Sequence, residues 1–144
     1  MKKLFFLIGM TFFFSSCEKE GVLTKGSNPI PTINNTAVLK YSGTFVPTSG
    51  ITVQGNVNIY AQGNKYQLQI ENITITDGPD LKVYLSKSDT PSSFVNLGNF
   101  KGNGTSVYDI PAQVDVSEYP YVLIHCQQYN HLFAIAELIS KQSN

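Results

Sequence analysis

Short stretches of alternating apolar and polar residues, broken by turn signals about every eight to twelve residues, restrict the fold of this chain most strongly. In 53–60, Val, Gly, Val and Ile alternate with Gln, Asn and Tyr. After the turn Gln62-Gly63-Asn64 the alternation resumes over 66–71. Such alternation is typical of strands with one buried face, and two of them around a short turn predict a β-hairpin. We find no amphipathic helix of useful length, so the pattern predicts an all-β chain.

The same pattern predicts about eight strands in a domain that begins near Ala37 and ends near Lys141. They cover residues 37–46, 53–60, 66–71, 73–76, 81–85 and 106–110, with two more inside 119–138. The alternation slips at Asn72-Ile73, which indicates either a bulge or the start of a new strand. Residues 86–99 and 112–120 are predicted to be connections. Strands of this length and spacing favour a single antiparallel β-sandwich.

The first 16 residues have the pattern of a targeting segment. Lys2-Lys3 is followed by an apolar run over 4–14, about half of the ~20 residues that a spanning helix needs. The run ends in small residues before Cys17, which resembles a bacterial lipoprotein signal, whose cysteine is acylated and becomes the first mature residue. The alternative is an ordinary secretory signal that contains a cysteine. Glu18, in place of the aspartate that retains lipoproteins at the inner membrane, favours the outer membrane.

Residues 17–36 are predicted to be the acylated cysteine and a flexible tether, because Gly, Ser, Asn and Pro interrupt any regular pattern. Several acyl chains on Cys17 would hold the protein to a membrane. The expected location is therefore the bacterial cell envelope, at the outer membrane, on its periplasmic or its surface-facing side.

Composition and motifs exclude several classes of protein. The chain has ten Lys and Arg against ten Asp and Glu, and none of the ten is Arg. It therefore lacks the basic surface of a nucleic-acid-binding protein. No Gly-x-Ser-x-Gly elbow, His-Glu-x-x-His motif or phosphate loop is present. The protein is not expected to be a hydrolase or transferase of a familiar type.

Any chemistry is expected near the end of the strand that precedes the polar connection 127–130. Cys126 is the one cysteine besides Cys17, and both histidines of the chain, His125 and His131, lie beside it in sequence. Neighbouring strand residues point to opposite faces. His125 is therefore not expected to activate the thiol of Cys126 or to bind the same metal ion as this thiol. Two interpretations remain open: a redox-active thiol, and a buried inert cysteine.

Two possibilities remain for a cofactor: a non-covalently bound haem, or no cofactor at all. A Cys-x-x-Cys-His attachment motif is absent, and both methionines lie in the leader. The candidate cofactor-binding residues are His125, His131 and Tyr129, beside Cys126 itself. Too few and poorly spaced Cys and His residues argue against a transition-metal site. Asp77 and Asp80 are interpreted as turn residues and not as a calcium loop.

Three blocks of sequence together resemble the DM-thirteen domain, a family with a proposed electron-transfer role that is related to the DOMON β-sandwiches. The matching positions are Gly78, Pro79, Asp80, Leu97, Gly98, Tyr108, Pro111, Cys126, Phe133 and Ala136. The resemblance implies a β-sandwich and places the family's cysteine, the proposed redox residue, at Cys126. His125 stands where the family usually has Trp, and Thr48-Ser49-Gly50 stands where the family usually has a His before the Gly.

Two functions follow from these observations. The first is a redox or electron-transfer accessory lipoprotein of the cell envelope, centred on Cys126 and acting with an unidentified redox or envelope partner. The second is a non-catalytic binding or scaffolding module with a structural cysteine. A thiol at the mouth of an apolar pocket lined by Tyr129 or Phe133 would favour the first. A buried Cys126 without an adjoining cavity would favour the second.

Overall fold

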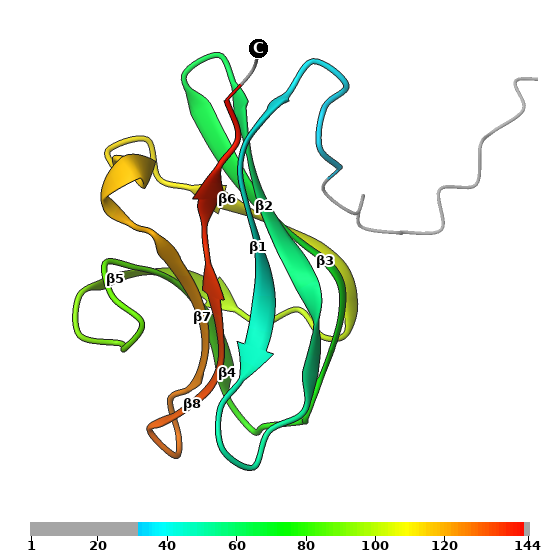
Figure 1. The fold of residues 1–144 in the computed structure, drawn as a ribbon, viewed down its shortest axis with the longest axis vertical. Helices are drawn as coiled ribbons and strands as arrows, with labels where there is room; N and C mark the ends of the chain where they lie inside the picture. The colour runs from blue at the N-terminus through cyan, green and yellow to red at the C-terminus, as the bar shows by residue number, and fades with distance from the viewer. Residues whose placement is uncertain (1–31, 143–144) are drawn as a thin grey trace, which may run out of the picture.

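The computed structural model describes residues 32–142 as an antiparallel β-sandwich (Figure 1). The strands are β1 (Val38–Pro47), β2 (Val53–Gln62), β3 (Lys65–Ile75), β4 (Leu81–Ser86), β5 (Phe94–Asn99), β6 (Gly104–Ile110), β7 (Tyr121–Cys126), β8 (His131–Glu137) and β9 (Ile139–Ser140). The predicted fold class is confirmed. The predicted leader and all but the last residues of the predicted tether lie outside the described residues. Within 32–142, no helix is long and apolar enough to cross a membrane.

The strands follow the order β5-β4-β7-β8-β1-β2-β3-β6, and β9 pairs with β1. One layer contains β9, β1, β2, β3 and β6, and the other contains β5, β4, β7, β8 and the end of β1. Strand β1 belongs to both layers, since residues 38–44 pair with β2 and residues 45–47 pair with β8. This shared strand joins the two layers along one side (Figure 1).

The core lies between the layers and is built from the alternation seen in the sequence. Val57 and Ile59 on β2 lie opposite Ile70 and Leu68 on β3, and all four are fully buried. The slip at Asn72 is a bulge: the register shifts between Ile70 and Ile73, and Asn72 has a φ of 49°. The chain continues through the bulge as one strand to Ile75, so the alternative of a separate strand over 73–76 was wrong.

Gly43 lies just before β1 passes from one layer to the other. A Cβ atom on this residue would collide with the carbonyl oxygen of Glu137 and lie 3.5 Å from the Cβ of Ala136. Tyr41 and Ser42 pair with β9, and Phe45 pairs with Ala136 of β8. The β8–β9 segment runs alongside β1 in a single register, from Phe45 opposite Ala136 to Tyr41 opposite Ser140, and it lies so close at Gly43 that only a residue without a side chain fits.

Two predicted connections contain regular structure. Residues 86–99 include strand β5, because Val95 and Leu97 pack against the core while the backbone pairs with β4. Residues 112–120 include a short 3-10 helix, η1 (Val116–Glu118), which buries Val116. The prediction of a connection over 86–99 was wrong at β5, because Asn and Gly interrupt the short apolar run of this strand and leave only a weak alternation.

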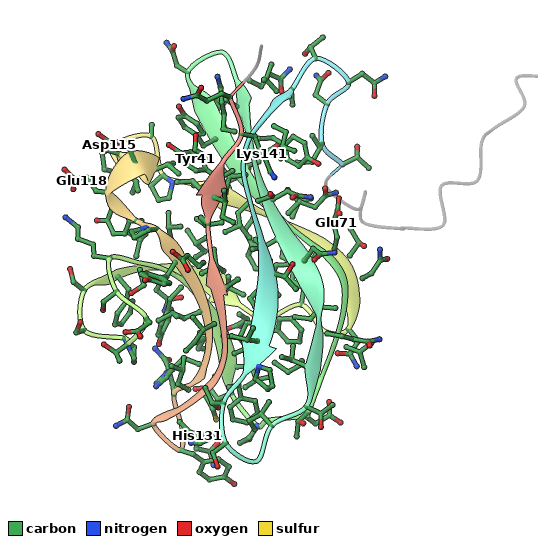
Figure 2. All side chains as sticks on the ribbon, viewed as in Figure 1. Tyr41, Glu71, Asp115, Glu118, His131 and Lys141 are labelled. Atoms are coloured by element: carbon green, nitrogen blue, oxygen red, sulfur yellow. The ribbon has the colours of Figure 1, made fainter. Side chains whose placement is uncertain are left out.

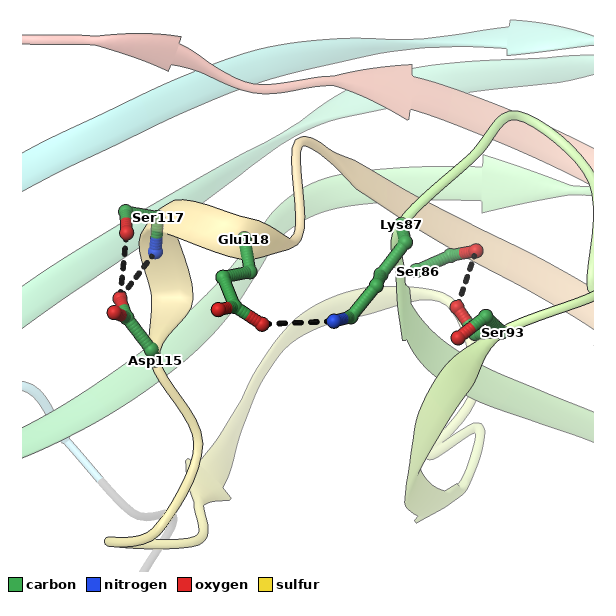
Figure 3. Close-up of polar contacts among 6 residues, drawn as sticks. All are labelled: Ser86, Lys87, Ser93, Asp115, Ser117 and Glu118. Carbon is green, nitrogen blue, oxygen red and sulfur yellow. Dashed lines mark hydrogen bonds and ion pairs between the residues drawn. The ribbon is translucent and has the colours of Figure 1, made fainter.

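Polar contacts tie the β4–β5 loop to η1 (Figure 3). The Lys87 ammonium lies 2.7 Å from a carboxylate oxygen of Glu118, which raises the pKa of Lys87. The Asp115 carboxylate caps η1 by accepting bonds from the backbone and the hydroxyl of Ser117, and these bonds lower its pKa. The Lys87 amide donates to the carbonyl of Ser93 at 2.9 Å, which closes the loop on itself.

Candidate functional site

Cys126 is the last residue of β7 and is fully buried. Its side chain belongs to the core cluster with those of Val122 and Ile124, whereas His125 does not. The prediction that Cys126 and His125 occupy opposite faces of the strand is confirmed. Cys126 is a free thiol, and its backbone pairs with Leu81 of β4 and His131 of β8.

Three turns meet at the end of the sandwich that contains Cys126, at the bottom of Figure 1. We call this end, formed by residues 48–50, 77–80 and 127–130, the thiol end. The amide of Gln127 donates to the carbonyl of Asp80 at 3.0 Å, and the amide of Thr48 donates to the carbonyl of Phe133 at 3.0 Å. These bonds tie each turn to a neighbouring element, so the thiol end is closed by backbone contacts.

Gly78 and Phe133 fill the interior of the thiol end. A Cβ atom on Gly78 would lie 2.7 Å from Cδ2 of Leu81 and 3.0 Å from Cζ of Phe133, so these groups leave no room for a side chain. Phe133 is only 5% exposed. None of the cavities found among residues 32–142 is lined by Cys126 or Phe133. The thiol is part of a packed core.

One of the other candidate cofactor ligands, His131, lies opposite Cys126 in the β7–β8 pairing, whereas His125 is on the other face of β7. Tyr129 is 66% exposed in the turn after β7. His131 lies exposed at the start of β8 (Figure 2), with its ring edge-on to Phe133 at 5.4 Å between centroids. His125 faces away from the core. Among the described residues, no group of three or more His, Cys, Asp or Glu side chains is placed to hold a metal ion.

His125 forms part of a row of rings on the outer face of β5, β4 and β7. The rings of Phe94 and Tyr84 stack with centroids 3.9 Å apart and an interplanar angle of 13°. The rings of Tyr84 and His125 follow at 5.5 Å and 28°. Gln127 donates from Nε2 to the Tyr84 hydroxyl at 2.8 Å. Although they lie on the outer face, Tyr84 and His125 are only 1% and 6% exposed.

Comparison with known families agrees with this geometry. The family model described as Electron transfer DM13 matches residues 44–138, from within β1 to the residue after β8. The chain belongs to the electron transfer DM13 family. The matched region contains both the packed thiol and the row of rings. No curated protein and no solved structure was found to match the chain.

The residues predicted to match the family's sequence blocks lie in turns, strands and the core. Tyr108 accepts a bond from the Lys101 amide at 3.0 Å, and the Lys101 ammonium lies 4.5 Å above its ring. Burial raises the pKa of Tyr108. Asp80 pairs with Lys82 at 2.7 Å. The remaining positions lie at Gly78 and Pro79 in the turn before β4, Leu97 and Gly98 in β5, Pro111 directly after β6, and Ala136 in the core.

The sequence alone does not predict the row of rings in this DM13 domain. Phe94 falls within residues 86–99, which the sequence pattern predicts to be a connection. A signal was present, because Tyr84 and Ser86 alternate with the apolar residues of β4. Which residues of β5 and β7 would flank them depends on strand order, which local alternation does not contain.

We expect acid to destabilise this DM13 domain through His125. Burial is the largest influence and lowers the pKa of His125 from 6.5. A hydrogen bond with the Asn130 side chain raises this pKa by less than burial lowers it, and the charge of His131 lowers it further. The unfolded chain therefore binds a proton at a higher pH than the folded one. Stability is full above about pH 6.5 and declines as the pH falls from there towards the lowered folded pKa.

Urea unfolding at about pH 7.5 and about pH 5.5 measures this effect. His125→Phe is expected to lose most of the difference between the two values, whereas His131→Gln should retain it. An equal pH dependence in the wild type and His125→Phe would show that other groups cause it.

Proposed function

We propose that the protein is a redox or electron-transfer accessory protein of the bacterial cell envelope, centred on Cys126. The observation that supports this most directly is the family match over 44–138, a region in which Cys126 is the only cysteine. A single thiol in the domain cannot form an internal disulfide. The available roles for its sulfur are a thiolate ligand, a mixed disulfide with a partner, or one-electron chemistry.

The burial of Cys126 restricts how such chemistry would proceed. A disulfide partner needs direct access to the sulfur, so the contacts that close the thiol end, such as Gln127 to Asp80, would have to open. A haem on this sulfur would require the same opening, and neither His125 nor Tyr129 faces the thiol. In the closed state, packing protects the thiol from oxidants in the envelope. The proposed redox activity of Cys126 therefore requires either local opening of the thiol end or contact with a partner protein.

The envelope location in this proposal comes from the first 36 residues. The leader over 1–16 would direct export and be removed, and the acylated Cys17 with the predicted tether to residue 36 would then hold the domain beside a membrane, at the outer membrane because Glu18 follows the cysteine. Acylation by several chains gives a durable attachment. The partner is then a redox or binding protein of the same compartment.

The two cysteines provide matched variants for one experiment. The protein is expressed with its own leader as wild type, Cys17→Ser and Cys126→Ala. Each form is tested for membrane association, visible absorption, metal content and reversible electrochemical response. Cys17→Ser should lose membrane association and keep the redox response. Cys126→Ala should keep membrane association and lose the redox response.

Two results would contradict the proposal separately. A colourless, metal-free and electrochemically silent wild type whose Cys126 also forms no mixed disulfide with an added disulfide reagent would remove the redox role. A Cys17→Ser variant that remains as firmly membrane-associated as the wild type would remove the lipid anchor. The two parts of the proposal can therefore fail independently.

A second function is favoured by the packing of the thiol itself. Cys126 is fully buried in the core and lines none of the cavities found among the described residues, as expected for a cysteine that acts as a small apolar side chain. In that case the domain is a non-catalytic binding module. Cys126→Ala would then lower stability and change nothing else, which the same experiment measures.

A further inference from the structure

A cavity of about 360 Å³ lies on the outer face of β4 and β7, beside the row of rings. It is lined by Tyr84, Pro91, Phe94, His125, Gln127 and Asn130. Pro91 comes from the β4–β5 loop, whose closing contacts are described above, and Gln127 and Asn130 come from the β7–β8 turn. The cavity is thus built from three separate segments on a sheet layer that fixes its floor.

Phe94 provides an open apolar surface at this cavity. One face of its ring stacks on Tyr84, yet the side chain remains 39% exposed. Pockets lined by aromatic side chains with a few polar groups beside them are typical of ligand sites. The Phe94 ring is held in place by stacking on a Tyr84 ring that is itself almost fully buried.

The polar groups around the cavity are uncharged and can both donate and accept hydrogen bonds. Gln127 and Asn130 are exposed carboxamides, and each has donor and acceptor atoms. The Gln127 amide is already aligned by its bond to the Tyr84 hydroxyl at 2.8 Å. The backbone of Asn130 is fixed in the turn: its φ is 46°, and its backbone amide donates to the backbone carbonyl of Gln127 at 3.2 Å.

His125 adds a buried polar atom that has no partner. Its side chain is only 6% exposed, and Nδ1 has no hydrogen-bond partner in the described structure. An unpaired buried polar atom is unfavourable unless another molecule satisfies it. His125 lines the cavity, so a ligand hydroxyl bound there is a candidate partner for its unpaired ring nitrogen.

The absence of charge among the six lining residues limits the ligand class. The nearest charged neighbour on the sheet is Lys82, which pairs with His125 across the strands and is occupied by Asp80 and Asn99. By contrast, a larger groove of about 800 Å³ on β1 and β8 is lined by Glu71, Asp89, Glu137 and Lys141. A charged ligand would lose hydration in the smaller cavity without gaining a partner.

We propose that the cavity beside the Phe94, Tyr84 and His125 rings binds one residue of a neutral saccharide. A sugar ring presents C–H groups on its face, which pack on Phe94, and hydroxyls on its edge, which pair with Gln127, Asn130 and His125. A flat neutral aromatic molecule would also stack on Phe94. It would leave the two carboxamides and His125 unpaired, which favours the saccharide. This proposal does not depend on a redox role for Cys126.

The test uses the whole protein and three neutral probes: maltohexaose, cellohexaose and chitohexaose. Binding is measured by calorimetry and by saturation-transfer NMR at up to about 10 mM sugar, where a Kd near ~1 mM is readily detected. At least one probe should bind the wild type. Phe94→Ala should weaken binding about tenfold, the factor that one aromatic contact supplies. Gln127→Ala should weaken it as well.

Tyr129→Ala is the matched control, because Tyr129 lies in the same turn, is 66% exposed and does not line the cavity. It should bind as the wild type does, and so should Cys126→Ala. Circular dichroism confirms that each variant is folded. The proposal is overturned if none of the sugars binds, or if Phe94→Ala and Tyr129→Ala bind them equally well. Menadione serves as the flat neutral aromatic probe, and the proposal is also overturned if menadione binds the cavity and the sugars do not.

Discussion

Gly43→Ala is expected to lower the free energy of unfolding by about 3 kcal/mol, the upper part of the range for overpacked sites. The added methyl group would overlap the carbonyl oxygen of Glu137. That oxygen belongs to the backbone of the last residue of β8, so a side-chain rotation cannot relieve the contact. The strands on both sides of β1 would have to separate, and the loss should appear as a lower urea midpoint.

Gly63→Ala is the matched control for this substitution. Gly63 lies in the β2–β3 turn with a φ of 57°, and a Cβ there meets nothing within 4 Å. Its replacement costs only the conformational strain of a left-handed alanine, about 1 kcal/mol. If Gly43→Ala costs no more than Gly63→Ala, the close approach between β1 and the backbone at Glu137 does not limit stability.

Phe133→Ala is expected to destabilise the domain by about 3–5 kcal/mol, as deletion of a buried aromatic ring usually does. Phe133 is 5% exposed, and its ring lies against Gly78 at the thiol end. The same change should make Cys126 more accessible. If opening is fast relative to modification, each 1.4 kcal/mol lost raises the rate of thiol labelling about tenfold. Labelling should therefore accelerate by about 10²- to 10³-fold.

Labelling of Cys126 with a water-soluble disulfide reagent, together with urea unfolding, measures both effects. Phe94→Ala removes the same side chain from a site that is 39% exposed, so it should cost about 1 kcal/mol and change labelling little. Phe133→Leu provides a milder form if the alanine variant does not fold. A wild-type thiol that reacts as fast as an unfolded one would contradict the packed thiol end.

The fold was predictable from the sequence where each strand has one buried face. Val57 and Ile59 against Leu68 and Ile70 are apolar at every second position, and the structure buries all four. Strand β5 was missed because Phe94–Asn99 contains two inward apolar residues, a glycine with a φ of 114° and a register shift. The pairing of β1 with β8 is a contact between distant segments, for which local alternation gives no signal.

The candidate site was predictable only in part, for the same reason. Strand geometry correctly placed Cys126 and His125 on opposite faces, because that depends on neighbouring residues alone. The row of Phe94, Tyr84 and His125 depends on three strands lying in the order β5-β4-β7. The closing of the thiol end by Gly78 and Phe133 likewise requires a turn and a strand from distant parts of the chain to meet.

Strand β1 also connects the N-terminal side of the described domain to the thiol end. It enters at Val38, beside the last described residues, where the Lys141 amide donates to the Lys40 carbonyl at 2.7 Å, and it runs from the top of Figure 1 to the thiol end at the bottom. Its ten residues span about 33 Å. The lipid anchor proposed at Cys17 would therefore join the domain at the end opposite Cys126, about one strand length from the thiol. A partner of the thiol would then bind the pole of the domain that lies opposite this junction.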